Sequence, residues 1–145
     1  AGVEQGMEPF VLAPPRDGKW EEAWRITEAL IERTHALAER NGARFLLVSV
    51  PYAIQVHPQR ALREALQAEL GVGDLFYPEQ RLASLAERAG IPAVLLAPAM
   101  QRLAEQTGAF FHGFERTGMG RGHWNAEGHQ TAATLIARKL CSDFR

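Results

Sequence analysis

The chain has 145 residues and a mass of 16.1 kDa, which is enough for one compact domain. Apolar residues make up 46% and charged residues 23%, a globular rather than a disordered composition. The formal net charge of -1 argues against a nucleic-acid partner or an acidic membrane surface, and one cysteine, Cys141, excludes an intrachain disulfide. The longest apolar run is far shorter than the roughly 20 residues of a membrane span.

The predicted elements begin with an irregular lead-in over residues 1–18, in which Phe10–Ala13 is a short apolar segment that would fit a strand. A helix follows, with Asp17 as its N-cap, because apolar residues recur at helical spacing until Asn41-Gly42. The run Arg44–Val50 is apolar except at its first residue and one serine. Such a run is typical of a strand buried on both faces of a parallel sheet.

Two more helices are predicted to begin at Pro58 and Pro78, because proline suits the first helical position. They end at Gly71 and Gly90, since glycine suits the left-handed position after a helix. The apolar run Ile91–Ala97 then predicts a second buried strand.

A helix is predicted from Pro98 to near Gly108, and Ala109–Phe114 is another short candidate strand. After a loop, the last helix runs from about Ala126 to Leu140. This alternation predicts an α/β fold with a short parallel sheet, built as a single domain over the whole chain. Typical sheets have about five strands, so we expect this sheet to be incomplete, with strands outside these residues.

The densest polar stretch is Phe110–His129, and it leads into the last helix. Four of its five glycines, at positions 113, 118, 120 and 122, precede the predicted helix and allow unusual backbone conformations. His123 stands two positions before Asn125, the predicted N-cap, and a histidine there suits general acid–base chemistry. The alternative is an imidazole that braces the helix. The spacing of His112, His123 and His129 matches no established metal-ligand pattern, so we expect no metal.

The segment His123–His129, His-Trp-Asn-Ala-Glu-Gly-His, resembles the C-terminal signature of the SGNH (GDSL-type) hydrolases and acyltransferases. In that signature a histidine is followed two positions later by asparagine and then by Gly-His. Three other segments are similar to the second half of that fold: Gly42–Pro51, Asp74–Leu82 and Gly90–Leu96. The resemblance implies a three-layer, flavodoxin-like α/β sandwich, of which this chain is the C-terminal portion.

The same resemblance implies ester hydrolysis or O-acyl transfer by a Ser-His-Asp triad without a cofactor, with His123 as the catalytic base. The substrate would be an ester-bearing small molecule or an acetylated carbohydrate. Trp124 and Arg121 are the predicted substrate contacts, the first as a pocket wall and the second for an anionic group. The alternative for Trp124 is packing under the loop, and the alternative for Arg121 is simple exposure to solvent. Asn125, Gly128 and His129 are predicted to be structural parts of the motif.

Two departures from the family pattern concern the other triad members. The family aspartate lies three residues before the histidine, where this chain has Gly120, and related alginate-acetylation proteins carry it where this chain has Arg121. Glu115 is a candidate substitute. None of the three serines lies in a Gly-Asp-Ser-type block; they are Ser49, Ser84 and Ser142. We therefore expect the nucleophile to lie upstream of Ala1 and this chain to be inactive by itself.

The alternative function is a non-catalytic module that retains the fold and binds a glycan or a protein. A homodimer paired through an unpaired sheet edge, such as that of Phe45–Val50, is a further expectation. Because similar proteins often act outside the cytoplasm, the resemblance also implies a periplasmic or membrane-anchored location, through an N-terminal part that precedes Ala1.

Overall fold

The computed structural model of the chain describes residues 9–116 and 118–143. Helices and short strands alternate in it, which confirms the predicted α/β class. The elements are η1 (Pro9–Leu12), α1 (Gly18–Arg40), β1 (Leu47–Ser49), α2 (Arg60–Leu70), α3 (Tyr77–Ala89), β2 (Ala93–Leu95), α4 (Leu96–Thr107), β3 (His112–Phe114), β4 (Gly118–Trp124) and α5 (Ala126–Asp143).

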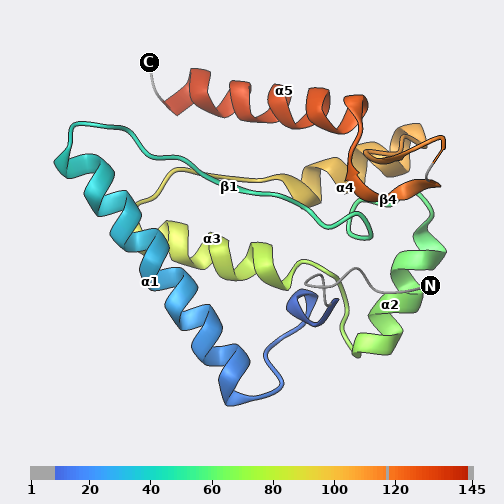
Figure 1. Cartoon of the computed structure of the whole chain (residues 1–145), viewed down its shortest axis with the longest axis horizontal. Helices are drawn as coiled ribbons and strands as arrows, with labels where there is room; N and C mark the ends of the chain where they lie inside the picture. The colour runs from blue at the N-terminus through green and yellow to red at the C-terminus, as the bar shows by residue number, and fades with distance from the viewer. Residues whose placement is uncertain (1–8, 117, 144–145) are drawn as a thin grey trace.

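The strands form two separate pairs. β1 and β2 are parallel, with Leu47 opposite Ala93 and Ser49 opposite Leu95. β3 and β4 form an antiparallel hairpin. Helix α5 lies above the parallel pair and α3 lies below it, while α4 continues directly from β2 (Figure 1). Among the described residues the parallel sheet is thus two strands wide.

The main apolar core lies between the parallel pair, α4 and α5. Its buried residues are Val56, Leu96, Ala97, Met100, Ala104, Phe111 and Ala132. A smaller core joins the beginning of the chain to α2 and the loop after it, and its buried residues are Leu12, Ala13, Leu70 and Leu75. Burial of Leu12 gives the predicted irregular lead-in a fixed contact with the rest of the fold.

One predicted strand segment is helical in the structure, and another is a strand only over its middle residues. Phe10–Ala13 was expected as a strand, but Pro9–Leu12 is a 3-10 helix. The run Ile91–Ala97 is a strand only over Ala93–Leu95, and α4 begins at Leu96 rather than at Pro98. The physical reason is that a short apolar run fits a buried helix as well as a strand. Here Leu96, Met100 and Ala104 continue the run at helical spacing and are buried on one side of α4.

Other predicted boundaries also change. β1 is half-buried rather than buried on both faces, and Val50 just after it is 65% exposed. Helix α2 begins at Arg60, so Pro58 lies before the helix and not at its first position. Residues 109–114 do not extend the parallel sheet, because β3 pairs with β4 instead. The predicted loop before α5 is therefore largely a hairpin.

Candidate functional site

The hairpin that carries His123 is irregular at its base. His112 of β3 lies opposite Trp124 of β4, but Gly113 lies opposite Met119, so residues 120–123 have no partner on β3. These four residues bulge out of the hairpin. The predicted glycine conformations are confirmed, since Gly113 and the glycines at 118, 120 and 122 all have positive φ. The bulge leaves His123 exposed, immediately before Trp124 and α5.

His112 joins this hairpin to the end of β1. Its side chain is buried, and it forms a hydrogen bond with the backbone carbonyl of Pro51, two residues beyond β1. Burial lowers the pKa of His112 to about 4; the Pro51 hydrogen bond opposes this, and the nearby His123 adds to it. His112 is therefore neutral at pH 7. Its Nδ1 is buried without a hydrogen-bond partner among the described residues, so the proton on Nε2 faces Pro51.

His57 explains why position 120 is a glycine. The buried His57 ring packs edge-on against Phe110, with centroids 5.3 Å apart, and its Nδ1 accepts a hydrogen bond from the backbone N–H of Gln59. A Cβ at Gly120 would overlap the His57 ring, and the φ of Gly120 is +81°. Burial lowers the pKa of His57, and the charge of Arg63 adds to this. The space of a side chain at position 120, where the family pattern has aspartate, is occupied by His57.

The Asn-Ala-Glu-Gly part of the motif fixes the start of α5. The predicted N-cap is confirmed, because Asn125 Oδ1 accepts a hydrogen bond from the Gly128 N–H at 2.9 Å. Asn125 Nδ2 donates to the Phe110 carbonyl at 2.7 Å, and the Asn125 N–H donates to the Phe111 carbonyl at 3.0 Å. Gly128 is buried so tightly against Phe111 that a Cβ would overlap the Phe111 carbonyl oxygen. These contacts hold the helix against the segment that leads into β3.

Trp124 lies between the motif and the core. It packs against the main core, and its ring lies edge-on to His112 and His129 with centroids 6.3 and 5.5 Å away. His129 itself is exposed. The Nε1 of Trp124 is buried and has no partner among the described residues. Packing against the main core and the two histidine rings thus explains the position of the Trp124 indole. A contact between Trp124 and substrate stays a prediction.

Arg121 belongs to the same bulge as His123, whereas Glu115 lies near the turn of the hairpin. Arg121 is exposed, and its guanidinium lies over Gly118. Glu115 lies beyond the pair formed by Phe114 and Gly118, toward the turn, whereas His123 is at the base of the hairpin. The structure therefore does not bring Glu115 to His123 as a substitute for the family aspartate.

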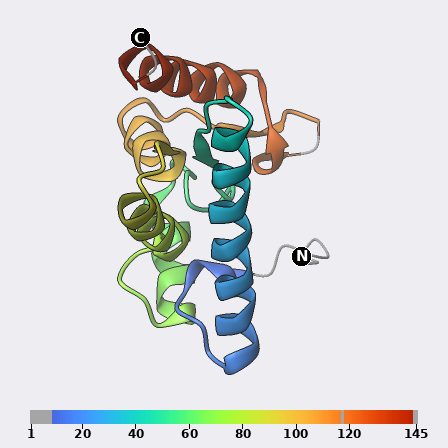
Figure 2. The same ribbon diagram turned by 90° about the vertical axis from the view of Figure 1, so that its left-hand side faces the viewer.

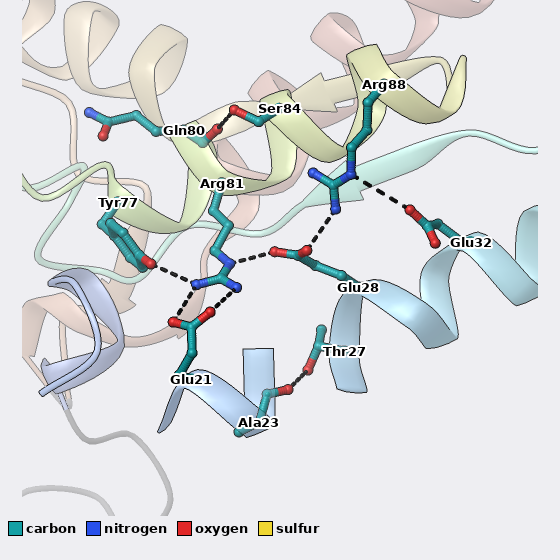
Figure 3. Close-up of polar contacts among 10 residues, drawn as sticks. All are labelled: Glu21, Ala23, Thr27, Glu28, Glu32, Tyr77, Gln80, Arg81, Ser84 and Arg88. Carbon is teal, nitrogen blue, oxygen red and sulfur yellow. Dashed lines mark hydrogen bonds and ion pairs between the residues drawn. The ribbon is translucent and has the colours of Figure 1, made fainter. Parts of the chain in front are cut away.

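The three serines lie in places that do not suit a nucleophile for His123. Ser49 is buried in β1. Ser84 Oγ donates to the Gln80 carbonyl within α3 at 3.1 Å (Figure 3). Ser142 is in the last turn of α5, about 25 Å along the helix from Asn125. Among the described residues, no hydrogen bond joins a serine to His123.

The described residues contain neither a metal-binding cluster nor a membrane-spanning helix. Over residues 9–116 and 118–143 no group of three or more His, Cys, Asp or Glu side chains is arranged to hold a metal ion. No helix in the same part of the chain has the length and apolarity to cross a membrane. The chain matches no protein-family model, no curated protein and no solved structure.

His112 and His57 are the site residues that sequence reasoning did not select. His57 stands just before Pro58 in a loop, a position typical of a surface residue, but it is buried against a hairpin residue 63 positions later, Gly120. His112 was weighed only as a metal ligand. Its position beside His123 depends on the bulge, for which the sequence offers one signal, the alternating glycines.

Proposed function

We propose that this chain supplies the histidine of an SGNH-type ester hydrolase or O-acyltransferase, with His123 as the general base. The observation that supports this most is the position of His123. It is exposed in a glycine-rich bulge ahead of a capped helix, and neighbouring His112 ties that bulge to the end of a parallel strand. The carboxyl ends of parallel strands are where α/β folds bind their ligands.

In this proposal the complete domain is a three-layer sandwich in which further strands extend the two-stranded sheet. A serine from a Gly-Asp-Ser-type segment outside these residues attacks the ester carbonyl. His123 takes the serine proton and returns it to the leaving alcohol, and water or a sugar hydroxyl then takes the acyl group. The acyl donor is an ester-bearing small molecule or an acetylated carbohydrate, which Arg121 and Trp124 contact at the edge of the site.

The test compares two versions of the protein with p-nitrophenyl acetate as substrate. We expect no esterase activity above the uncatalysed rate from the 145-residue chain. We expect activity from a version that extends upstream through a Gly-Asp-Ser-type segment. Activity of the 145-residue chain would contradict the assignment of the nucleophile to another segment.

A non-catalytic module that binds a glycan or a protein is the second candidate. The observation in its favour is the filled space at position 120, because Gly120 packs against His57 and leaves no room there for the aspartate that orients the family histidine. Absence of esterase activity from both versions, together with glycan binding in calorimetry that mutation of His123 weakens, would favour this candidate.

A further inference from the structure

A cavity between η1 and the start of α1 is walled by aromatic side chains. Its volume is about 220 Å³, and the rings that line it are those of Phe10, Trp20 and Trp24. Phe10 is 38% exposed and Trp20 is half-buried, so part of each side chain is open to solvent. Figure 1 and Figure 2 both show the start of α1 at the end of the molecule away from α5. This cavity, which we name the aromatic pocket, is therefore separate from the candidate site around His123.

The walls of the aromatic pocket are fixed by contacts with the rest of the fold. Ala13, which lines the pocket, is 4% exposed and belongs to the smaller apolar core. Pro15 also lines it, and its ring fixes the backbone φ angle there. The Trp24 ring is held from α3, because it lies edge-on to Tyr77 with centroids 5.9 Å apart and has the Arg81 guanidinium 5.3 Å from its centroid. A ligand therefore meets preformed walls, which lowers the entropic cost of binding.

Two side chains of opposite charge also line the aromatic pocket, Arg16 and Asp17. The Arg16 guanidinium lies over the Phe10 ring, with its Cζ 4.6 Å from the ring centroid. The Asp17 carboxylate caps α1, and both capping hydrogen bonds, at 2.9 and 3.0 Å, are accepted by Oδ1. Because Asp17 is exposed, its Oδ2 can accept a further hydrogen bond from a ligand. The pocket thus offers donors and an acceptor beside its aromatic walls.

These surroundings favour a small neutral ligand that is both apolar and rich in hydroxyl groups. Aromatic rings attract cations, but Arg16 and Arg81 already place guanidinium groups on two of these rings, so a further cation is repelled. An anion would be repelled by the Asp17 carboxylate. The cavity is smaller than the roughly 300–1,000 Å³ of drug-sized sites, so its occupant is about one ring in size. A pyranose sugar fits, because it has C–H groups on the faces of its ring and hydroxyl groups around the rim.

We propose that the aromatic pocket binds one neutral pyranose ring of a carbohydrate. The C–H face of the sugar stacks on the Trp20 ring, Arg16 donates hydrogen bonds to hydroxyl oxygens, and Asp17 accepts one from a hydroxyl group. Burial of the C–H face supplies affinity, and the two polar side chains set the orientation of the sugar. The proposal does not depend on the proposed function, because no residue of the hairpin or of α5 lines this pocket.

The test follows the indole N–H signals of the isotope-labelled 145-residue chain by NMR during titration with a sugar. The sugars are methyl β-glucopyranoside, methyl β-galactopyranoside and methyl β-mannopyranoside, each titrated separately. The chain has three tryptophans, whose signals are assigned with single Trp→Phe variants. We expect at least one sugar to move the Trp20 and Trp24 signals with a Kd of about 1 mM, the affinity typical of a ligand of about thirteen non-hydrogen atoms. The Trp124 signal should stay in place.

Three substitutions separate the polar contacts from the fold. Asp17→Asn keeps the helix cap, because asparagine caps as well as aspartate, but it removes the carboxylate. It should weaken binding about fivefold, and Arg16→Gln should do the same, since each replaces a charged hydrogen bond by a neutral one. The matched control is Arg33→Gln, which changes an exposed arginine of α1 outside the pocket and should bind like wild type.

Trp20→Ala should abolish sugar binding while the Trp24 and Trp124 signals keep the positions of the folded protein. The proposal would be overturned if none of the three sugars moved the Trp20 signal. Movement of the Trp124 signal alone would also overturn it, because the sugar would then bind at the candidate site. So would tighter binding of tetramethylammonium than of any sugar, which would identify a cation site, or sugar binding that tolerates Trp20→Ala.

Discussion

Acid should destabilise this protein through His112, and the size of the effect follows from its surroundings. Burial lowers the pKa of His112 from 6.5 to about 4, so the folded state resists protonation that the unfolded chain accepts. Stability from this residue is fully present above pH 6.5 and is lost as the pH falls toward 4. The loss should be about 2 kcal/mol at pH 5 and about 3 kcal/mol at pH 4.

The perturbation that isolates this effect is His112→Gln, which keeps a polar side chain but removes the titrating ring. At pH 8 the variant should be less stable than wild type by about 1–2 kcal/mol, because the contact with Pro51 and the fit beside Trp124 are weakened. Between pH 8 and 5 it should lose about 2 kcal/mol less than wild type does. The pKa of His57 is also lowered, so its protonation in acid destabilises wild type and variant alike. The contribution of His57 therefore cancels when the two proteins are compared.

The assay is urea unfolding at several pH values, followed by tryptophan fluorescence, with free energies from linear extrapolation. The control is His129→Gln, which removes an exposed histidine in the first turns of α5. Its stability should depend on pH as that of the wild type does. Equal slopes of stability against pH for wild type and His112→Gln would refute the buried, neutral state of His112.

Three further substitutions test how the motif holds α5 and the hairpin. Gly128→Ala should cost about 2–3 kcal/mol in chemical unfolding, because the new methyl overlaps the Phe111 carbonyl, whereas Gly73→Ala, which meets open space, should change stability by less than about 1 kcal/mol. Asn125→Ala should lower stability by about 1–2 kcal/mol, and intact stability would argue against its role as the helix cap. Gly120→Asp should destabilise the fold and yield no active site, since the residue has positive φ and faces His57; a rise in esterase activity of the extended protein would contradict this.

Locally encoded features could be predicted from the sequence, and contacts between distant segments could not. Asp17 caps α1 as expected, with its carboxylate accepting from the N–H groups of Lys19 and Trp20 at 2.9 and 3.0 Å. The Asn125 cap was predictable for the same reason, since both caps bond residues within three positions. The α4 boundary was missed because apolar residues fill both β2 and the buried side of the helix that follows.

The candidate site was predictable in part. The histidine that precedes α5 and the unusual glycine conformations followed from the sequence, but the bulge that exposes His123 did not. That bulge depends on which residues of β3 and β4 pair, and on His57 filling the space beside Gly120. The alternating glycines indicate unusual backbone conformations, but they do not show which strand residues pair or that His57 packs against Gly120.

The central claim is that His123 is the catalytic base of an acyl-transfer site. Its most direct test is kcat/KM for p-nitrophenyl acetate in the version of the protein extended through a Gly-Asp-Ser-type segment, measured for wild type, His123→Ala and His129→Ala. We expect His123→Ala to lose at least about a thousandfold in kcat/KM with an unchanged Tm, and His129→Ala to stay within a few fold of wild type. An active extended enzyme that keeps its full rate in His123→Ala would contradict the claim.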